Sequence, residues 1–334
     1  SIQEVTEEIV IKIAKNVREK TNKKYLCLAG GVALNCVANG KLLRSGIFED
    51  IYIQPAAGDA GGALGSAQIA WYQYLNNSRE VDGTTDAMKG AYLGPEFSDT
   101  EIEDFLKENN YTYSKLKEDD LINQVADLIA GQNVIGWFQG RMEFGPRALG
   151  SRTIIGDARS SETQKTINLK IKYRESFRPF APSIREENIS EYFDIDRPSP
   201  YMLLVADVKK DKQLPMSQEE ESYFGLKKLN IARSEIPAVT HVDYSARIQS
   251  VSKITNSKYH KLLSVFNEKH GCPVVVNTSF NVRGEPIVCT PKDAYMCFMR
   301  TEMDYLVLNN FILKKAYQKP LEKDEDWRNQ FQLD

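Results

Sequence analysis

Histidine is scarce in this 334-residue sequence, and both long hydrophobic runs and an excess of basic charge are absent. The histidines are His241, His260 and His270, so a metal site in the first 240 residues needs other ligands, or ligands supplied from elsewhere. No apolar stretch approaches the roughly 18 residues of a membrane-spanning helix. The 43 basic side chains nearly balance the 46 acidic ones. These features argue against a membrane protein and against a general nucleic-acid surface.

Cysteine is also infrequent, with five residues and no C-x-x-C pair. The odd number and the apolar neighbours of most of them predict reduced core residues in a cytoplasmic protein. A cysteine nucleophile is the alternative, but none of the five stands in an activating sequence context.

The order of the predicted elements indicates an α/β protein. Apolar residues recur every four positions from the first residues onward, so the chain begins inside an amphipathic helix and looks truncated. Loop-forming residues dominate 76–98 and arginine-rich loops fill 141–185. Strands are expected at 25–29, 51–54, 134–138, 202–208, 274–277 and 305–308, and helices at 32–45, 63–74, 99–109, 121–130, 259–270 and 291–299.

Two glycine-rich motifs lie in the first 75 residues. Gly30 and Gly31 follow a strand and precede a helix that carries Asn35, a context in which backbone N–H groups can bind phosphate. A tight turn that needs glycine only for its geometry explains this motif equally well. Asp59 stands among glycines and alanines before the next helix, where it could bind a metal or cap the helix.

Arginine is concentrated in one part of the chain. Seven of the sixteen arginines lie between residues 141 and 185, among glycine, proline and aromatic residues that do not form a solvated helical face. Guanidinium groups in rigid loops suit bidentate capture of phosphate or carboxylate, which is the favoured interpretation. A structural salt-bridge network with Glu143, Asp157 and Glu175 is the alternative. Arg247 offers a further anion contact.

Polar residues also gather after a predicted buried strand. The segment 277–281 supplies Asn277, Thr278, Ser279 and Asn281 at the end of the strand, where ligands bind in open α/β sheets. An ordinary turn rich in Asn, Ser and Thr remains the alternative. A serine hydrolase is disfavoured, because the sequence has no G-x-S-x-G motif.

Taken in order, these motifs resemble the NodU/CmcH/TobZ family of O-carbamoyltransferases. They are Cys-Leu-Ala-Gly-Gly-Val-Ala-Leu-Asn, Gln-Pro-Ala-Ala-Gly-Asp-Ala-Gly-Gly-Ala-Leu-Gly, Phe-Gly-Pro-Arg-Ala-Leu-Gly-Ser-Arg, Phe-Arg-Pro-Phe-Ala-Pro and Asn-Thr-Ser-Phe-Asn. The resemblance implies a partial actin-like (ASKHA/RNase H-like) lobe at 1–80 and a linker at 81–98. It further implies a YrdC-like α/β domain with a twisted mixed sheet at 99–334.

The resemblance also implies a reaction. Carbamoyl phosphate and ATP, with Mg²⁺, would form carbamoyl-adenylate, and the carbamoyl group would pass to a hydroxyl of a small-molecule or saccharide acceptor at a metal site, with iron as the expected metal. Asp59 would be a ligand of that metal, and the remaining site residues would divide into two groups. The catalytic group is Arg147, Arg152, Asn277 and Ser279, and the binding group is Gly30, Gly31, Asn35, Arg141, Glu143, Arg178, Arg247, Thr278 and Asn281.

The sequence departs from the family in one respect. The family's metal ligands include histidines from the first half of the actin-like domain, and no histidine precedes His241 here. We therefore expect the chain to bind carbamoyl phosphate and nucleotide without completing the transfer. A threonylcarbamoyl-adenylate-type synthase and a non-catalytic anion-binding module are the alternative functions, and a homodimer is compatible with the sequence.

Overall fold

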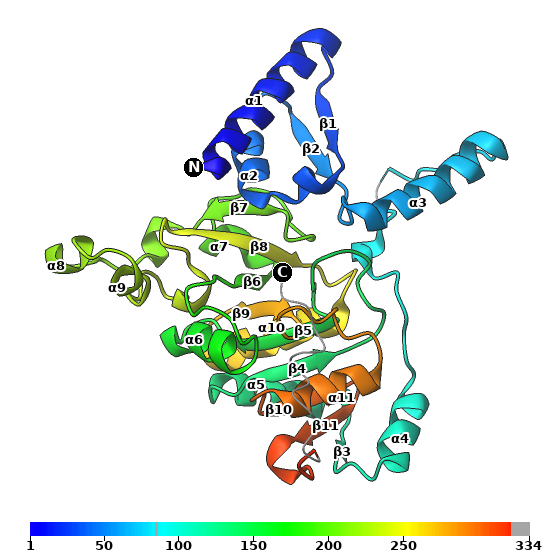
Figure 1. Cartoon of the computed structure of the whole chain (residues 1–334), viewed down its shortest axis with the longest axis vertical. Helices are drawn as coiled ribbons and strands as arrows, with labels where there is room; N and C mark the ends of the chain where they lie inside the picture. Colours follow the sequence, from blue (N-terminus) through cyan, green and yellow to red (C-terminus); the bar gives the residue numbers. More distant parts are fainter. Residues whose placement is uncertain (84–85, 322–334) are drawn as a thin grey trace.

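The computed structural model describes residues 1–83 and 86–321. Residues 84 and 85 of the predicted linker and residues 322–334 of the predicted C-terminal unit lie outside the described residues. A two-stranded sheet lies in the N-terminal part, and the rest of the structure is built around a nine-stranded sheet (Figure 1). The predicted α/β class is therefore confirmed, and the large sheet is mixed, with parallel and antiparallel neighbours.

The N-terminal part packs two helices against a pair of parallel strands. Its elements are α1 (Ile2–Thr21), β1 (Tyr25–Leu28), α2 (Cys36–Arg44) and β2 (Asp50–Ile53). Ser1 and Glu4 form a capping box that starts α1, and Asn22 ends the helix in the left-handed conformation. Ala14, Leu42 and other apolar side chains form a small core between the helices and the strands.

Two predicted helices of this part have different bounds in the structure. The helix expected at 32–45 is divided into a 3₁₀ turn, η1 (Gly31–Leu34), and α2, because the Asn35 side chain accepts a hydrogen bond from the backbone nitrogen of Ala38 at 3.1 Å and starts a new helix. The helix expected at 63–74 begins earlier, as α3 (Asp59–Ile69), and continues into a π-helical segment, η2 (Ala70–Tyr74).

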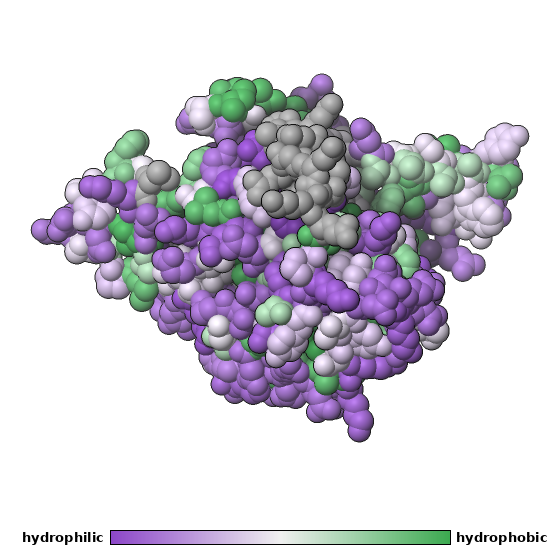
Figure 2. All heavy atoms as spheres, turned by 60° about the horizontal axis from the view of Figure 1, so that its bottom comes forward, coloured by the Kyte–Doolittle hydropathy of each residue, from purple (hydrophilic) through white to green (hydrophobic). Residues whose placement is uncertain are grey.

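The α3 and η2 segment projects from the body of the molecule (Figure 1). None of the residues of α3 or η2 is buried, although Ile69 and Trp71 are large and apolar. Figure 2 shows hydrophobic residues along the arm on the right, in contrast to the mainly hydrophilic surface of the larger body.

The large sheet has the strand order β3-β11-β10-β4-β5-β9-β6-β8-β7. Neighbours are antiparallel except for two parallel pairs, β10 with β4 and β6 with β8. The strands are β3 (Ser114–Lys115), β4 (Ile135–Phe138), β5 (Arg152–Asp157), β6 (Ala181–Arg185), β7 (Leu204–Asp207), β8 (Ser245–Val251), β9 (Val274–Ser279), β10 (Tyr305–Leu308) and β11 (Phe311–Lys314).

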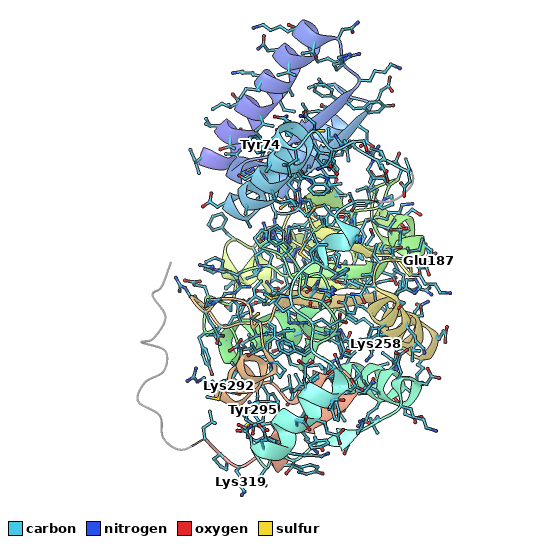
Figure 3. All side chains as sticks on the ribbon, turned by 90° about the vertical axis from the view of Figure 1, so that its right-hand side faces the viewer. Tyr74, Glu187, Lys258, Lys292, Tyr295 and Lys319 are labelled. Carbon is cyan, nitrogen blue, oxygen red and sulfur yellow. The ribbon has the colours of Figure 1, made fainter. Side chains whose placement is uncertain are left out.

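Amphipathic helices cover this sheet and bury its apolar residues in one continuous core. Helix α10 packs on α5 and on β6 and β9, whereas α11 packs on β4, β10 and α4. The longer helices are α4 (Asp99–Glu108), α5 (Glu118–Ala130), α6 (Ser161–Lys170), α10 (Ser257–His270) and α11 (Pro291–Arg300). Short segments are η3 (Lys89–Ala91), η4 (Glu186–Asn188), α7 (Ile189–Tyr192), η5 (Lys210–Lys212), α8 (Gln218–Glu221), α9 (Leu226–Leu229), η6 (Pro237–Val239) and η7 (Lys315–Tyr317). Tyr295 of α11 and Lys319 lie at the end of the molecule opposite the N-terminal helices (Figure 3).

The expectation that 141–185 consists of arginine-rich loops is wrong in part. This region contains β5, α6 and β6, and all six residues of β5 are buried between β4 and β9. Pairing on both sides satisfies the backbone of β5, so a strand forms despite the arginine at its first position.

The N-terminal part contacts the large sheet where α2 lies along β7. Asn39 donates to the carbonyl oxygen of Leu203 at 3.1 Å, and Arg44 donates to that of Val205 at 2.7 Å. The approach is close because residue 40 is glycine: a Cβ atom there would lie 2.3 Å from the Val205 oxygen.

Part of the segment predicted as a linker, 81–98, packs against the body of the molecule. Met88 and Ala91 are buried, and the Tyr92 hydroxyl donates to the carbonyl oxygen of Leu149 at 2.6 Å.

Within the described residues, no helix combines the length and the apolar character that crossing a bilayer requires.

Candidate functional site

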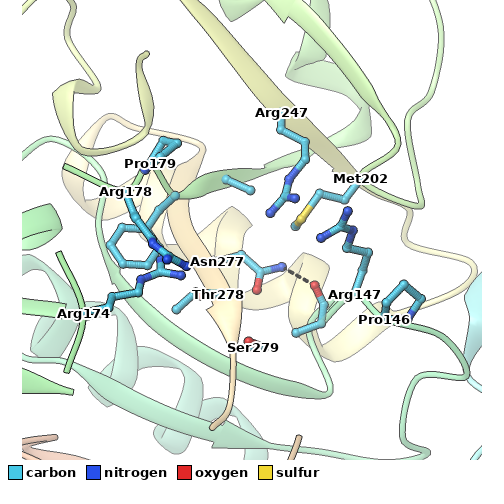
Figure 4. A pocket seen from close by; sticks show the side chains of 13 residues that line it. Pro146, Arg147, Arg174, Arg178, Pro179, Met202, Arg247, Asn277, Thr278 and Ser279 are labelled. Atoms are coloured by element: carbon cyan, nitrogen blue, oxygen red, sulfur yellow. Dashed lines mark hydrogen bonds between the residues drawn. The ribbon is translucent and has the colours of Figure 1, made fainter. Parts of the chain in front are cut away.

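A cavity of about 320 Å³ opens where the C-terminal end of β9 meets the loops that precede β5 and β6. Its lining is rich in arginine and in small polar side chains (Figure 4). The lining residues are Pro146, Arg147, Ala148, Arg174, Arg178, Pro179, Phe180, Ala181, Met202, Arg247, Asn277, Thr278 and Ser279. Strand β9 therefore places polar residues at its end, as the sequence predicts.

Arginines reach the cavity from three different parts of the chain. Arg147 lies in the loop between β4 and β5, Arg174 and Arg178 lie between α6 and β6, and Arg247 lies on β8. Figure 4 shows Arg174 and Arg178 on one side of Asn277, with Arg147 and Arg247 on the other. The fold thus brings together two pairs of guanidinium groups that are up to 100 residues apart in sequence.

The cavity carries positive charge that the protein leaves largely uncompensated. No acidic residue is among the residues that line it. Arg178 pairs with Glu175 at 3.0 Å, and within the described residues no such pair forms for the other three arginines. Burial lowers the pKa of Arg147 to about 10, and the nearby charge of Arg247 adds to this shift. Such a site favours an anion, because the anion relieves both the desolvation and the repulsion between like charges.

Glu143 and Arg152 lie behind the cavity wall and hold the loop that carries Arg147. Glu143 is buried, and its Oε1 accepts hydrogen bonds from the backbone nitrogens of Leu149, Ser151 and Arg152 at 2.7, 2.8 and 3.2 Å. Arg152 is fully buried, and its guanidinium lies 3.5 Å from the centre of the Phe138 ring. The same guanidinium donates to the carbonyl oxygens of Gln139, Gly140, Ser151 and Pro95. Both Nη groups of Arg152 thus bond the protein backbone, and its Nε is buried without a partner among the described residues.

Lys172 is a further buried residue of this region, and sequence reasoning missed it. Its amine donates to the backbone and side-chain oxygens of Ser279 and Asn281, including Asn281 Oδ1 at 2.7 Å. Asn281 also donates to the carbonyl oxygen of Glu285 at 2.6 Å. Asn281 therefore does not line the cavity, but together with Lys172 it fixes the turn after Ser279. Nothing in the sequence marks Lys172 as a residue of this site except its position two residues before Arg174.

The buried amine of Lys172 predicts a pH effect on stability. Burial lowers its pKa to about 7, whereas a lysine in the unfolded chain has a pKa of about 10.4. Between these values the unfolded chain binds more protons, so the free energy of unfolding rises with pH. We expect this rise to be smaller in Lys172→Met by about 1–2 kcal/mol between about pH 7 and about pH 9, measured by urea unfolding.

The matched control for this prediction is Lys170→Met, since Lys170 lies two residues before Lys172, at the end of α6, and is exposed. This variant should keep the wild-type pH slope. An unchanged slope in Lys172→Met would contradict the prediction.

The remaining predicted site residues lie outside the cavity lining. Gly30 and Gly31 are exposed, and a Cβ atom at either would meet no other atom within 4 Å, so a ligand could approach this backbone. Asn35 caps α2. Its neighbour Leu34 reaches the cavity, because its carbonyl oxygen accepts a hydrogen bond from Arg147 at 3.5 Å. Arg141 is exposed and lies 3.6 Å from Glu96 on the surface.

Asp59 does not have the surroundings of a metal ligand in this chain. It is exposed at the first position of α3, whose cap is Gly58. Across residues 1–83 and 86–321, no group of three or more His, Cys, Asp and Glu side chains could hold a metal ion. The donor set around Asp59 is therefore insufficient for the metal centre that the resemblance implies.

Comparison with known proteins identifies the family. A family model described as "Carbamoyltransferase C-terminus" matches residues 126–315, which include all of the cavity lining. A second model, "Carbamoyltransferase N-terminus", matches residues 1–68. The chain belongs to the carbamoyltransferase family. This assignment confirms the resemblance to the NodU/CmcH family and its transferase class.

Curated relatives of the chain are considerably longer than it is. Protein sll1178 of Synechocystis sp. is 59% identical over 100% of the chain and 54% of its own length. Nodulation protein NolNO of Sinorhizobium fredii is 40% identical over 98% of the chain and 44% of its own length. A 3′-hydroxymethylcephem-O-carbamoyltransferase of Amycolatopsis lactamdurans is 32% identical over 91% and 52%. The chain thus spans about half the length of these relatives.

Solved structures give a weaker match to the chain. Full-length HypF in its phosphate- and nucleotide-bound form has a TM-score of 0.36 at 15% identity, covering 63% of the chain and 23% of HypF. HypF of T. kodakarensis has a TM-score of 0.35 at 14% identity, covering 61% and 22%. These scores are too low to support the actin-like or YrdC-like assignment, which stays a prediction together with the domain bounds.

Proposed function

We propose that the arginine-lined cavity binds carbamoyl phosphate and ATP and forms carbamoyl-adenylate, from which the carbamoyl group passes to a hydroxyl acceptor. The observation that carries this proposal is the concentration of four arginines in a cavity without an acidic lining residue. Both substrates bring phosphate groups, and bidentate guanidinium contacts suit phosphate oxygens.

The cavity has two pairs of arginines, and the first step of the proposed reaction brings together two anionic substrates, carbamoyl phosphate and ATP. Arg174 and Arg178 lie on one side of Asn277, and Arg147 and Arg247 lie on the other (Figure 4). We assign one pair to the phosphate of carbamoyl phosphate and the other to the phosphates of ATP. Negative charge accumulates in the transition state of such a step, and fixed cations stabilise that charge. Mg²⁺ bound to ATP would neutralise part of the same charge.

The proposed reaction is balanced. Carbamoyl phosphate, ATP and one water give carbamoyl-adenylate, phosphate and pyrophosphate. The acceptor oxygen then attacks the carbamoyl carbon, the bond to the AMP phosphate breaks, and AMP leaves as the acceptor proton is released. The named substrate of the cephem relatives carries a hydroxymethyl group, which supports a hydroxyl acceptor. Because Asp59 lacks a set of metal ligands among the described residues, we assign only the first step to this chain alone.

An isotope-exchange experiment tests this function. The purified chain should move label from pyrophosphate into ATP only when carbamoyl phosphate and Mg²⁺ are present. Exchange that instead requires bicarbonate and threonine would replace the proposal with a threonylcarbamoyl-adenylate-type synthase. Binding of phosphate without exchange under any of these conditions would indicate a non-catalytic anion-binding module.

A further inference from the structure

The side-chain amide of Asn277 is held in one orientation inside the cavity. Asn277 is 1% exposed, and its Nδ2 donates to the carbonyl oxygen of Ala148 at 3.0 Å and to Oε1 of Gln249 at 2.7 Å. A backbone carbonyl oxygen can only accept hydrogen bonds, so the amide group that faces the Ala148 oxygen must be the Asn277 nitrogen and not its oxygen. Figure 4 shows this hydrogen bond between the two arginine pairs.

Gln249 fixes the second contact in the same way. It is also 1% exposed, and its Nε2 donates to the carbonyl oxygen of Leu149 at 2.7 Å. Its Oε1 must therefore face Asn277, and it accepts a further hydrogen bond from the Ser183 hydroxyl at 2.5 Å. Two backbone carbonyls, those of Ala148 and Leu149, thus determine the orientation of both amides.

This arrangement leaves the carbonyl oxygen of Asn277 without a partner. Oδ1 is buried and forms no hydrogen bond with any described residue. A buried oxygen of this kind is costly to leave unpaired, by about 1–3 kcal/mol. Most other polar groups of the lining are arginines, which can only donate hydrogen bonds. Asn277 Oδ1 is the only side-chain carbonyl oxygen among the lining residues, so it can pair with a ligand group that donates.

We propose that Asn277 Oδ1 accepts a hydrogen bond from the NH₂ group of the carbamoyl moiety and so selects a carbamoyl group over other acyl groups. Gln249 is the positioning residue, since it acts through Asn277. The inference rests on the proposed function, because it needs the phosphate of the ligand to occupy the arginines. The arginines would then bind any acyl phosphate, and Asn277 would distinguish its acyl group.

Two stable ligands that differ only in this group provide the test. Phosphonoacetamide carries the NH₂ group, 2-oxopropylphosphonate carries a methyl group of similar size in its place, and inorganic phosphate reports on the arginines alone. Calorimetry on the wild-type chain should show phosphonoacetamide binding about 10–100-fold more tightly than 2-oxopropylphosphonate, the range expected when a buried acceptor loses its donor.

Variants of the two amides separate recognition from folding. Asn277→Leu should weaken phosphonoacetamide to the level of 2-oxopropylphosphonate and leave the affinity for inorganic phosphate unchanged. Gln249→Met should reduce the preference in the same direction and leave the affinity for inorganic phosphate unchanged, because Gln249 acts only through the orientation of Asn277. Asn39→Leu is the matched control: Asn39 is buried and bonds two carbonyl oxygens, but it does not line the cavity. This control should keep the wild-type preference.

The outcomes distinguish the two proposals. Equal binding of phosphonoacetamide and 2-oxopropylphosphonate to the wild-type chain, or equal weakening of both by Asn277→Leu, overturns the role of Asn277 and leaves the phosphate site intact. Failure of inorganic phosphate and of both phosphonates to bind overturns the proposed function itself.

Discussion

Replacement of Arg147 by alanine should weaken the binding of carbamoyl phosphate and of inorganic phosphate about 10–100-fold, which is the range for a lost hydrogen bond to a charged group. Its Nη2 makes one long contact, 3.5 Å to the Leu34 oxygen, and its Nε is buried without a partner among the described residues. The side chain is therefore free to bind a ligand. Titration calorimetry with inorganic phosphate measures the effect.

The melting temperature of Arg147→Ala should remain within a few degrees of the wild-type value. Burial and the charge of Arg247 both disfavour the charged form of Arg147, so its removal relieves an unfavourable interaction. Arg141→Ala is the control, because Arg141 is exposed and lies outside the cavity. Wild-type phosphate affinity in Arg147→Ala would show that this residue is not in contact with the anion.

Replacement of Arg152 by alanine should have the opposite pattern and lower the free energy of unfolding by about 3–5 kcal/mol. The guanidinium of Arg152 is fully buried, stacks on Phe138 and donates to four backbone carbonyl oxygens, including that of Gln139 at 2.9 Å. Removing it leaves a cavity and unpaired carbonyl groups at the same time. Urea unfolding measures the loss.

Phosphate binding by Arg152→Ala should fall only to the extent that the loop carrying Arg147 loses its shape. Below the temperature at which this variant unfolds, the residual affinity should exceed that of Arg147→Ala. A fully stable Arg152→Ala that no longer binds phosphate would contradict this interpretation, since it would place Arg152 in direct contact with the ligand as the sequence suggests.

The sequence predicts elements well where apolar periodicity and capping residues agree. The helix expected at 291–299 is present as α11, which Thr290 and Asp293 begin with a capping box, and the strand expected at 305–308 is β10. Strand β5 is not predicted, because Arg152 and the surrounding glycines favour a loop. Pairing with β4 and β9, which are 14 and more than 100 residues away, overrides that local preference.

The sequence predicts which types of residue line the candidate site, but it identifies only some of the individual lining residues. The structure brings Arg147, Arg178 and Arg247 together with the polar end of β9, and it adds Arg174 and Met202 to the lining. Arginine density alone cannot separate the guanidinium of Arg147, which faces the cavity, from that of Arg152, which bonds the backbone. That difference depends on which carbonyl groups lie within reach of each side chain, and these come from distant segments such as Pro95 and Leu34.

The contact of α2 with β7 has a consequence for association between molecules. Strand β7 is an edge strand of the nine-stranded sheet, and an exposed edge strand is a template for pairing with another chain. Asn39 and Arg44 occupy the carbonyl oxygens of Leu203 and Val205. At the opposite end, β3 has only two residues, one of them Lys115. Both edges of the sheet are thus protected against edge-to-edge aggregation, one by a helix and the other by its shortness and charge.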